Sequence, residues 1–199
     1  MSPLDSHERQ ILLKTARLVI QQAAEKGSFS GFGAEPGPSR IHETGRAFVT
    51  LRRGKQLRGC MGQLEGPLSL LIAVGMAAGF AAMEDPRFEP VKPAEVAGLT
   101  IEISVLTPFE EITPEKVIIG THGLVIQQGH RRGLLLPQVA TEHKLSRERF
   151  LEETCMKAGL PRDAWRDRAT TVFAFSAEFF SEEDYPQNKS GADKMSAPQ

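Results

Sequence analysis

The order of predicted elements indicates a fold that mixes helices with antiparallel hairpins in a chain of 199 residues. Two segments, 46–63 and 124–136, alternate in polarity on either side of a short turn, as the two strands of a hairpin do. An apolar or amphipathic helical segment follows each of them, so the order seen at 46–83 recurs at 124–158. This faint internal echo predicts two related halves.

Helical periodicity predicts the first element and the central one. Residues 5–26 can form an amphipathic helix that Asp5 and Glu8 cap at its start and Gly27 ends. Residues 66–83 carry no charge and are apolar on every side, which is typical of a helix buried in a protein or in a membrane. The segment is shorter than the roughly 20 residues that span a bilayer. We therefore expect it deep inside the domain.

The remaining segments are assigned from alternation and from the glycines and prolines that interrupt it. Residues 27–39 and 85–90 are expected to be irregular, because Gly and Pro are frequent there. The further predicted elements are a strand at 99–107, a helical turn at 113–115, a helix that begins at Pro137, a helix at 146–158, a last strand at 170–179 and a disordered tail from 186.

Composition restricts the function more than it defines it. The chain has 24 basic and 25 acidic residues, a balance that argues against a dedicated nucleic-acid or anionic-membrane binder. Its two cysteines cannot form a disulfide framework, and its N-terminus lacks a secretory signal, so a reduced, cytoplasmic setting is expected. The five histidines lack the spacing of a local zinc motif, and no cofactor signature is present.

The segment 57–62, which contains the letters LRGC, is the strongest candidate for chemistry. Cys60 lies between Gly59 and Gly62, which leave the backbone open, and Arg58 precedes it by two residues. A guanidinium that faced the thiol would lower its pKa and favour a nucleophilic thiolate. The alternative is a strand cysteine that packs as a small apolar residue, with the glycines making room for a helix.

Three segments are predicted to converge on one cleft between the halves: the strand 58–62, the loop 85–88 and the helix start at Pro137. Asp85 and Arg87 would stand on its rim, and His122 or Gln138 would complete the pocket. A buried Arg87 would need a carboxylate, for which Asp85 and Glu102 are the candidates. The alternative is that the three segments are dispersed and serve only packing.

Basic residues cluster at the two hairpin turns, where they could bind an anionic ligand or simply remain solvated. They are Arg52, Arg53, Lys55 and Arg58 at the first turn, and Arg131 and Arg132 at the second. The single Tyr and single Trp argue against stacking on nucleic-acid bases.

Six segments in this order make the chain resemble the AMMECR-type domain family, whose bacterial and archaeal members are called AmmeMemoRadiSam system protein A. The segments are 57–62, 85–88, 101–108, 122–124, 133–140 and 150–160. The resemblance covers about residues 8–182. Met61 stands where the family usually has Ile, which is a mild departure.

The resemblance implies an α+β fold: one domain over residues 1–185, in which two related halves, about 40–100 and 101–180, surround one curved, barrel-like, mostly antiparallel sheet. It implies no cofactor, and an association with a Memo-like protein and a radical S-adenosylmethionine (SAM) enzyme in a modification pathway. Two functions follow as expectations. One is a thiol-centred enzyme or substrate-handling component of that pathway. The other is a non-catalytic binding module whose cleft recognises a partner protein or a small anionic ligand.

Overall fold

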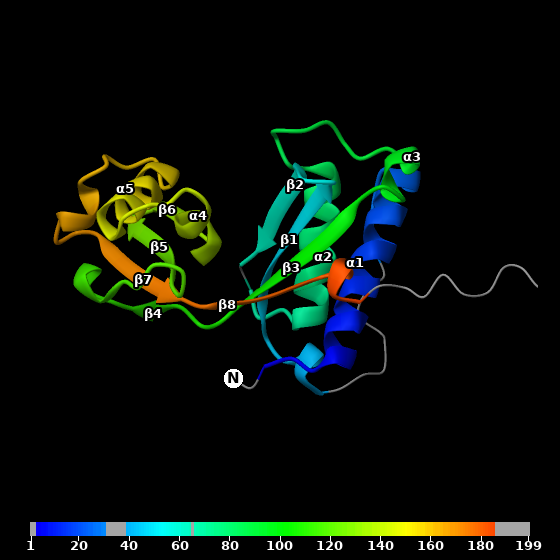
Figure 1. The fold of residues 1–199 in the computed structure, drawn as a ribbon, viewed down its shortest axis with the longest axis horizontal. Helices are drawn as coiled ribbons and strands as arrows, with labels where there is room; N and C mark the ends of the chain where they lie inside the picture. The colour runs from blue at the N-terminus through cyan, green and yellow to red at the C-terminus, as the bar shows by residue number, and fades with distance from the viewer. Residues whose placement is uncertain (1–2, 31–38, 65, 186–199) are drawn as a thin grey trace, which may run out of the picture.

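The computed structural model describes residues 3–30, 39–64 and 66–185 and confirms an α+β architecture (Figure 1). Its strands form two antiparallel four-stranded sheets, so the expectation of a single barrel-like sheet is not confirmed, and the described strands close no barrel. Sheet 1 has the order β2 (Gln56–Gln63), β1 (Arg46–Arg53), β3 (Thr100–Leu106) and β8 (Ala177–Ser181). Sheet 2 has the order β4 (Glu110–Glu111), β7 (Thr171–Phe175), β5 (Gly123–Gln128) and β6 (Arg131–Leu135).

Each sheet is the centre of one lobe. The first lobe comprises the described residues up to 106 together with 177–185, and the second lobe comprises residues 107–176. The first lobe carries α1 (Ser6–Lys26), α2 (Leu70–Met83) and α3 (Pro93–Val96), and the second carries α4 (Pro137–Glu142) and α5 (Arg147–Lys157). The short 3-10 segments are η1 (Ser39–His42), η2 (Pro114–Lys116), η3 (Ala164–Arg166) and η4 (Glu182–Asp184).

The first lobe buries the two helices that the sequence predicts. Asp5 caps α1 through a 2.8 Å bond from the Glu8 N–H, and Glu8 returns a 2.9 Å bond to the Asp5 N–H. The charge-free segment forms α2, which begins after Ser69 and contacts α1, β1 and β2. Contact on several sides explains why α2 has no polar face. No described helix is both long and apolar enough to cross a membrane.

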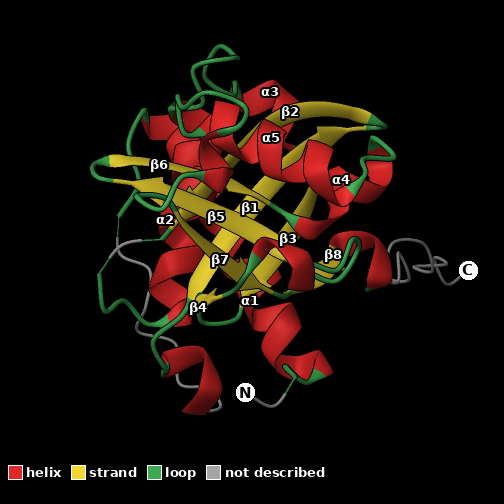
Figure 2. Ribbon diagram, turned by 90° about the vertical axis from the view of Figure 1, so that its left-hand side faces the viewer, coloured by secondary structure: helices red, strands yellow, loops and turns green. Residues whose placement is uncertain are grey.

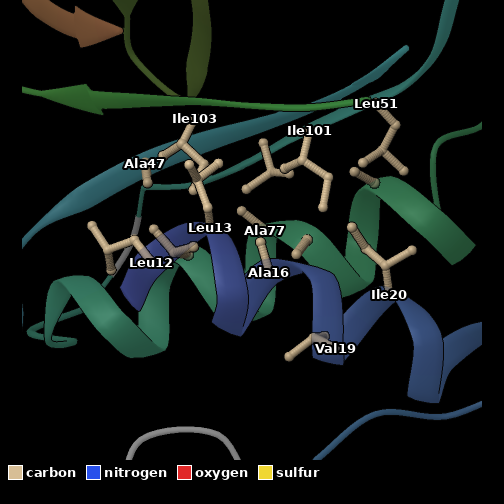
Figure 3. Close-up of a cluster of buried hydrophobic side chains, with 14 of the residues drawn as sticks. Leu12, Leu13, Ala16, Val19, Ile20, Ala47, Leu51, Ala77, Ile101 and Ile103 are labelled. Atoms are coloured by element: carbon tan, nitrogen blue, oxygen red, sulfur yellow. The ribbon is translucent and has the colours of Figure 1, made fainter. Parts of the chain in front are cut away.

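The core of the first lobe lies between these helices and one face of sheet 1 (Figure 3). Ile101 and Ile103 from β3 and Leu51 from β1 point toward α1 and α2, where Leu12 and Ile20 meet them. All five side chains have no solvent exposure. Burial of each stabilises the fold by about 1.5–3 kcal/mol before conformational entropy is subtracted.

The second lobe has a core of its own under α5. Phe150, Leu151 and Cys155 on α5 pack against Leu124 and Ile126 on β5. Cys155 is fully buried, so it serves the packing of this core.

The two lobes are joined where the chain crosses between the sheets. The N–H of Thr107 donates to the carbonyl oxygen of Ser176 over 2.9 Å, and the N–H of Ser176 donates to Thr107 Oγ1 over 2.9 Å. The prediction of one strand at 170–179 is therefore wrong. Ser176 divides it, because the chain leaves sheet 2 there and continues as β8 in sheet 1.

The described helices of the first lobe cover one face of sheet 1, and the other face is turned toward the second lobe (Figures 1 and 2). We call it the lobe-facing surface of sheet 1. The predicted disordered tail, 186–199, and much of the predicted loop 27–39, namely residues 31–38, lie outside the described residues.

Candidate functional site

The strand register places Cys60 on the lobe-facing surface of sheet 1. Thr50 pairs with Cys60, Leu51 with Gly59 and Arg52 with Leu57, so Arg58 is an extra residue that forms a β-bulge. Gly59 faces α2 so closely that a Cβ there would collide with the carbonyl oxygen of Ala81. The next residue, Cys60, therefore points to the opposite face of the sheet.

Cys60 is partly exposed, and its surroundings favour the protonated thiol. Thr50 Oγ1 donates to Cys60 Sγ over 3.3 Å. Burial raises the pKa of the Cys60 thiol, and this effect outweighs the hydrogen bond from Thr50 and the charge of Arg87, both of which lower it. The net effect of these surroundings on the pKa of the thiol is upward.

The loop after α2 binds the backbone of β2, which is an edge strand of sheet 1. Asp85 Oδ2 accepts a 2.8 Å hydrogen bond from the Cys60 N–H, and Arg87 Nη2 donates over 3.4 Å to the Cys60 carbonyl oxygen. One carboxylate and one guanidinium thus occupy the two outward-pointing backbone groups of a single edge residue. We call this Asp85–Arg87 arrangement the edge latch.

The edge latch is held together by its own ion pair. Arg87 Nε lies 2.9 Å from Asp85 Oδ1, and Arg87 Nη2 lies 2.7 Å from Asp85 Oδ2. The guanidinium of Arg87 and the N–H groups of Cys60 and Arg87 lower the pKa of Asp85 to about 2, despite burial. Arg87 was expected to be buried, yet its side chain is 52% exposed. Of its two candidate partners, Asp85 is the one used.

The bulge directs Arg58 away from the thiol and toward Glu95. Its Nε and Nη2 lie 3.1 and 3.0 Å from the two carboxylate oxygens of Glu95, and the pKa of Glu95 falls to about 2 mainly through this pairing. The Phe88 ring lies beside two guanidiniums, 6.0 Å from that of Arg58 and 5.5 Å from that of Arg87. Arg58 therefore fixes the loop and does not present a free charge to Cys60.

Gly62 has a packing role in the same hairpin. It pairs with Phe48 across the strands, and the Phe48 ring occupies the space that a side chain at Gly62 would fill. The glycines at 59 and 62 thus admit a helix backbone on one face of the sheet and an aromatic ring on the other.

The remaining two candidates lie in the second lobe. His122 Nδ1 accepts a 3.2 Å hydrogen bond from the Ile118 N–H, and His122 lines a pocket of about 470 Å³. Gln138 lies in the first turn of α4, and its buried Oε1 accepts no hydrogen bond from the part of the chain that the structure describes. Within the described residues, neither side chain is hydrogen-bonded to Cys60 or to the edge latch. The strand 58–62 and the loop 85–88 come together, and the participation of the Pro137 helix start stays a prediction.

Two of the four basic residues at the first turn form ion pairs, Arg58 with Glu95 and Arg52 with Glu102. The Arg52 pair measures 2.7 Å, and Glu102 was the other candidate partner for Arg87. At the second turn, Arg131 donates to the Gly159 carbonyl oxygen over 3.1 Å. In the described ranges, no group of three His, Cys, Asp or Glu residues could hold a metal ion.

Sequence reasoning missed two residues of this site. The turn at Gly54 alone would place Val49 opposite Cys60, and the bulge at Arg58 shifts the register by one residue, so Thr50 stands there instead. Glu95 reaches Arg58 from α3, a four-residue helix that the sequence analysis did not predict.

Most of this chain is similar to known proteins. The AMMECR1 family profile matches residues 13–180. The chain belongs to the AMMECR1 family. It is 41% identical over 189 residues to a protein of Methanothermobacter thermautotrophicus, covering 92% of this chain and 98% of the relative. A second AMMECR1 relative, from Aquifex aeolicus, is 43% identical over 145 residues, which cover 69% of this chain and 74% of that protein.

A solved structure supports the fold of this AMMECR1 chain. The crystal structure of the uncharacterized protein PH0010 from Pyrococcus horikoshii is similar with a TM-score of 0.80 and 42% sequence identity. The similarity covers 86% of this chain and 90% of that chain.

Proposed function

We propose that this AMMECR1-family protein is a non-catalytic binding module, and that the lobe-facing surface of sheet 1 recognises a partner protein or a small anionic ligand. The observation that carries the proposal is the chemical state of Cys60. Its pKa is raised, its N–H is bound to Asp85, and the nearby Arg58 is paired with Glu95. A catalytic thiol needs a thiolate and a neighbouring base.

The same contacts suit a recognition surface. The edge latch and the Arg58–Glu95 pair fix the backbone of β2 and the loop that follows α2, so the surface they carry is pre-organised. Pre-organisation favours binding, because less conformational entropy is lost when a ligand arrives. The Memo-like protein and the radical SAM enzyme that the family resemblance implies are the partner proteins we propose.

Thiol alkylation tests the proposal against the enzyme hypothesis. We expect Cys60 in the folded protein to react with iodoacetamide at pH 6 no faster than N-acetylcysteine, because burial disfavours its thiolate. Cys155 is the internal control and should react only on unfolding, since it is fully buried. Peptide mass spectrometry follows both residues separately.

Faster alkylation of Cys60 than of the free thiol would contradict the binding module and favour the thiol-centred enzyme. In that case Arg87→Gln should slow the reaction, because Arg87 is the cation that lowers the thiol pKa. Cys60→Ser is the matched control that removes the signal without removing the strand.

A further inference from the structure

Two guanidiniums from different lobes share one aromatic ring at the lobe junction. The Cζ of Arg46, the first residue of β1, lies 5.0 Å from the Phe109 ring centroid. The Cζ of Arg132, on β6, lies 5.2 Å from the same centroid. Phe109 belongs to the connection between β3 and β4, and Phe175 supports its ring at 5.3 Å.

The ring is part of the apolar contact between the lobes. Phe109 packs against the cluster that contains Leu106 of the first lobe and Val125, Leu136 and Phe175 of the second. Because this cluster belongs to both lobes, it fixes the ring in place. The two guanidiniums, each about 5 Å from one centroid, are therefore at most about 10 Å apart.

Among the residues that the structure describes, these two guanidiniums meet no carboxylate. Five arginines of the first lobe form ion pairs: Arg9, Arg17, Arg52, Arg58 and Arg87. Within the described ranges Arg46 and Arg132 form none. Arg46 Nε donates to the Leu64 carbonyl oxygen over 3.3 Å, and its two Nη groups donate no hydrogen bond to any other described residue. Two like charges this close, without a counter-charge, attract an anion.

We propose that the Arg46–Phe109–Arg132 cluster binds a small oxyanion that carries two or more negative charges. The inference rests on the proposed binding function and names its ligand class and its position. Guanidinium donors match the oxygens of phosphoryl and carboxylate groups, and an anion long enough to span the gap between the two guanidiniums, at most about 10 Å, would contact both arginines. Arg132 is exposed and Arg46 is partly exposed, so solvent reaches the cluster. A bound anion would tie the two lobes together.

Calorimetric titration of the full chain tests the site with pyrophosphate, citrate and acetate as probes. We expect the wild type to bind pyrophosphate or citrate more tightly than acetate, and comparison of the first two distinguishes phosphoryl from carboxylate ligands. Arg46→Gln and Arg132→Gln should each weaken binding at least about tenfold, since each removes one of the two cations. Arg46→Lys should lose less, because it keeps the charge.

Arg131→Gln is the matched control, because it removes a neighbouring arginine that contacts Gly159 and not Phe109. It should change binding by less than about twofold. Circular dichroism melting confirms that each variant is folded, and a rise in Tm with the anion gives a second readout.

Three outcomes would overturn the inference. The first is that the wild type binds neither pyrophosphate nor citrate. The second is that Arg131→Gln weakens binding as much as Arg132→Gln. The third is that Arg87→Gln abolishes binding while Arg46→Gln does not. The last outcome moves the ligand to the edge latch and leaves the proposed function standing. Failure of the proposed function itself is read separately, from the alkylation rate of Cys60.

Discussion

The hairpin β1–β2 of the first lobe and the hairpin β5–β6 of the second each place a glycine against the backbone of a helix. A side chain at Gly59 would collide with Ala81 of α2, and one at Gly133 would collide with Ala158, which follows α5. Each sheet also places a second glycine under a cross-strand phenylalanine ring. The pairs are Gly62 with Phe48 and Gly123 with Phe175.

The two hairpins differ in whether side chains bind the outward backbone groups of their edge strand. The edge latch occupies both outward backbone groups of Cys60 on β2, whereas β6 has no carboxylate–guanidinium latch in the described part of the chain. At Cys60 the edge of β2 is therefore closed to pairing with another strand. The difference teaches that the residues around Cys60 serve first to fix a backbone, which is why their charges are already paired.

The largest expected loss of stability comes from filling the space at the two glycines that contact a helix backbone. Gly59→Ala and Gly133→Ala should each lower the free energy of unfolding by about 3 kcal/mol, because a new methyl group meets helix backbone that cannot move cheaply. Gly98→Ala is the control, since its nearest neighbour would lie at an ordinary 3.6 Å. Urea unfolding measures all three. A large loss at one site only would break the equivalence of the hairpins.

The edge latch should show the next largest effect. Asp85→Asn is expected to lower the free energy of unfolding by about 1–2 kcal/mol, because Arg87 loses its carboxylate and the buried oxygens lose their charge. Glu102→Gln breaks the more exposed pair with Arg52 and should cost less than about 0.5 kcal/mol. Equal losses for the two variants would mean that the latch is no stronger than a surface ion pair.

A smaller effect should appear in the pH dependence of stability. Asp85 and Glu95 have folded-state pKa values of about 2, against ordinary values of 3.8 and 4.5. As the pH falls, the unfolded chain binds these protons first, so the free energy of unfolding is retained above about pH 4.5 and declines toward pH 2. The variant Asp85→Asn/Glu95→Gln should reduce that decline by about 1 kcal/mol. If the free energy of unfolding of this variant declined between pH 4.5 and pH 2 as much as that of the wild type, the lowered pKa values would be contradicted.

Much of the fold could be predicted because local signals were strong. The cap at Asp5, the charge-free α2 and the helix start at Pro137 were all found from sequence, and the meeting of Asp85 with the Cys60 strand was predicted as well. The assignment of strands to sheets was not. Alternation through 170–179 looks the same whether the chain stays in one sheet or changes sheet at Ser176.

The chemistry of the site was harder to predict, because side-chain partners depend on the tertiary structure. Arg58 was expected to face the thiol, but a bulge in β2 turns it toward Glu95. Nothing in the local sequence reveals a bulge of this kind, since it appears only when the two strands are aligned. The Arg46–Phe109–Arg132 cluster was also missed, because its three residues come from three separate elements.

The chain crossing at Ser176 has a consequence for protein synthesis. β3 pairs with β8, and Leu106 opposite Ala177 is separated from it by the entire second lobe, on the order of 70 residues. During translation the second lobe leaves the ribosome before the strand that completes sheet 1. Helix α1 also lacks one of its contacts until then, because its Arg9 forms a 2.7 Å ion pair with Glu178 of β8. The part of the chain made first is therefore the part completed last, and until then the edge of β3 stands open to pair with another nascent chain.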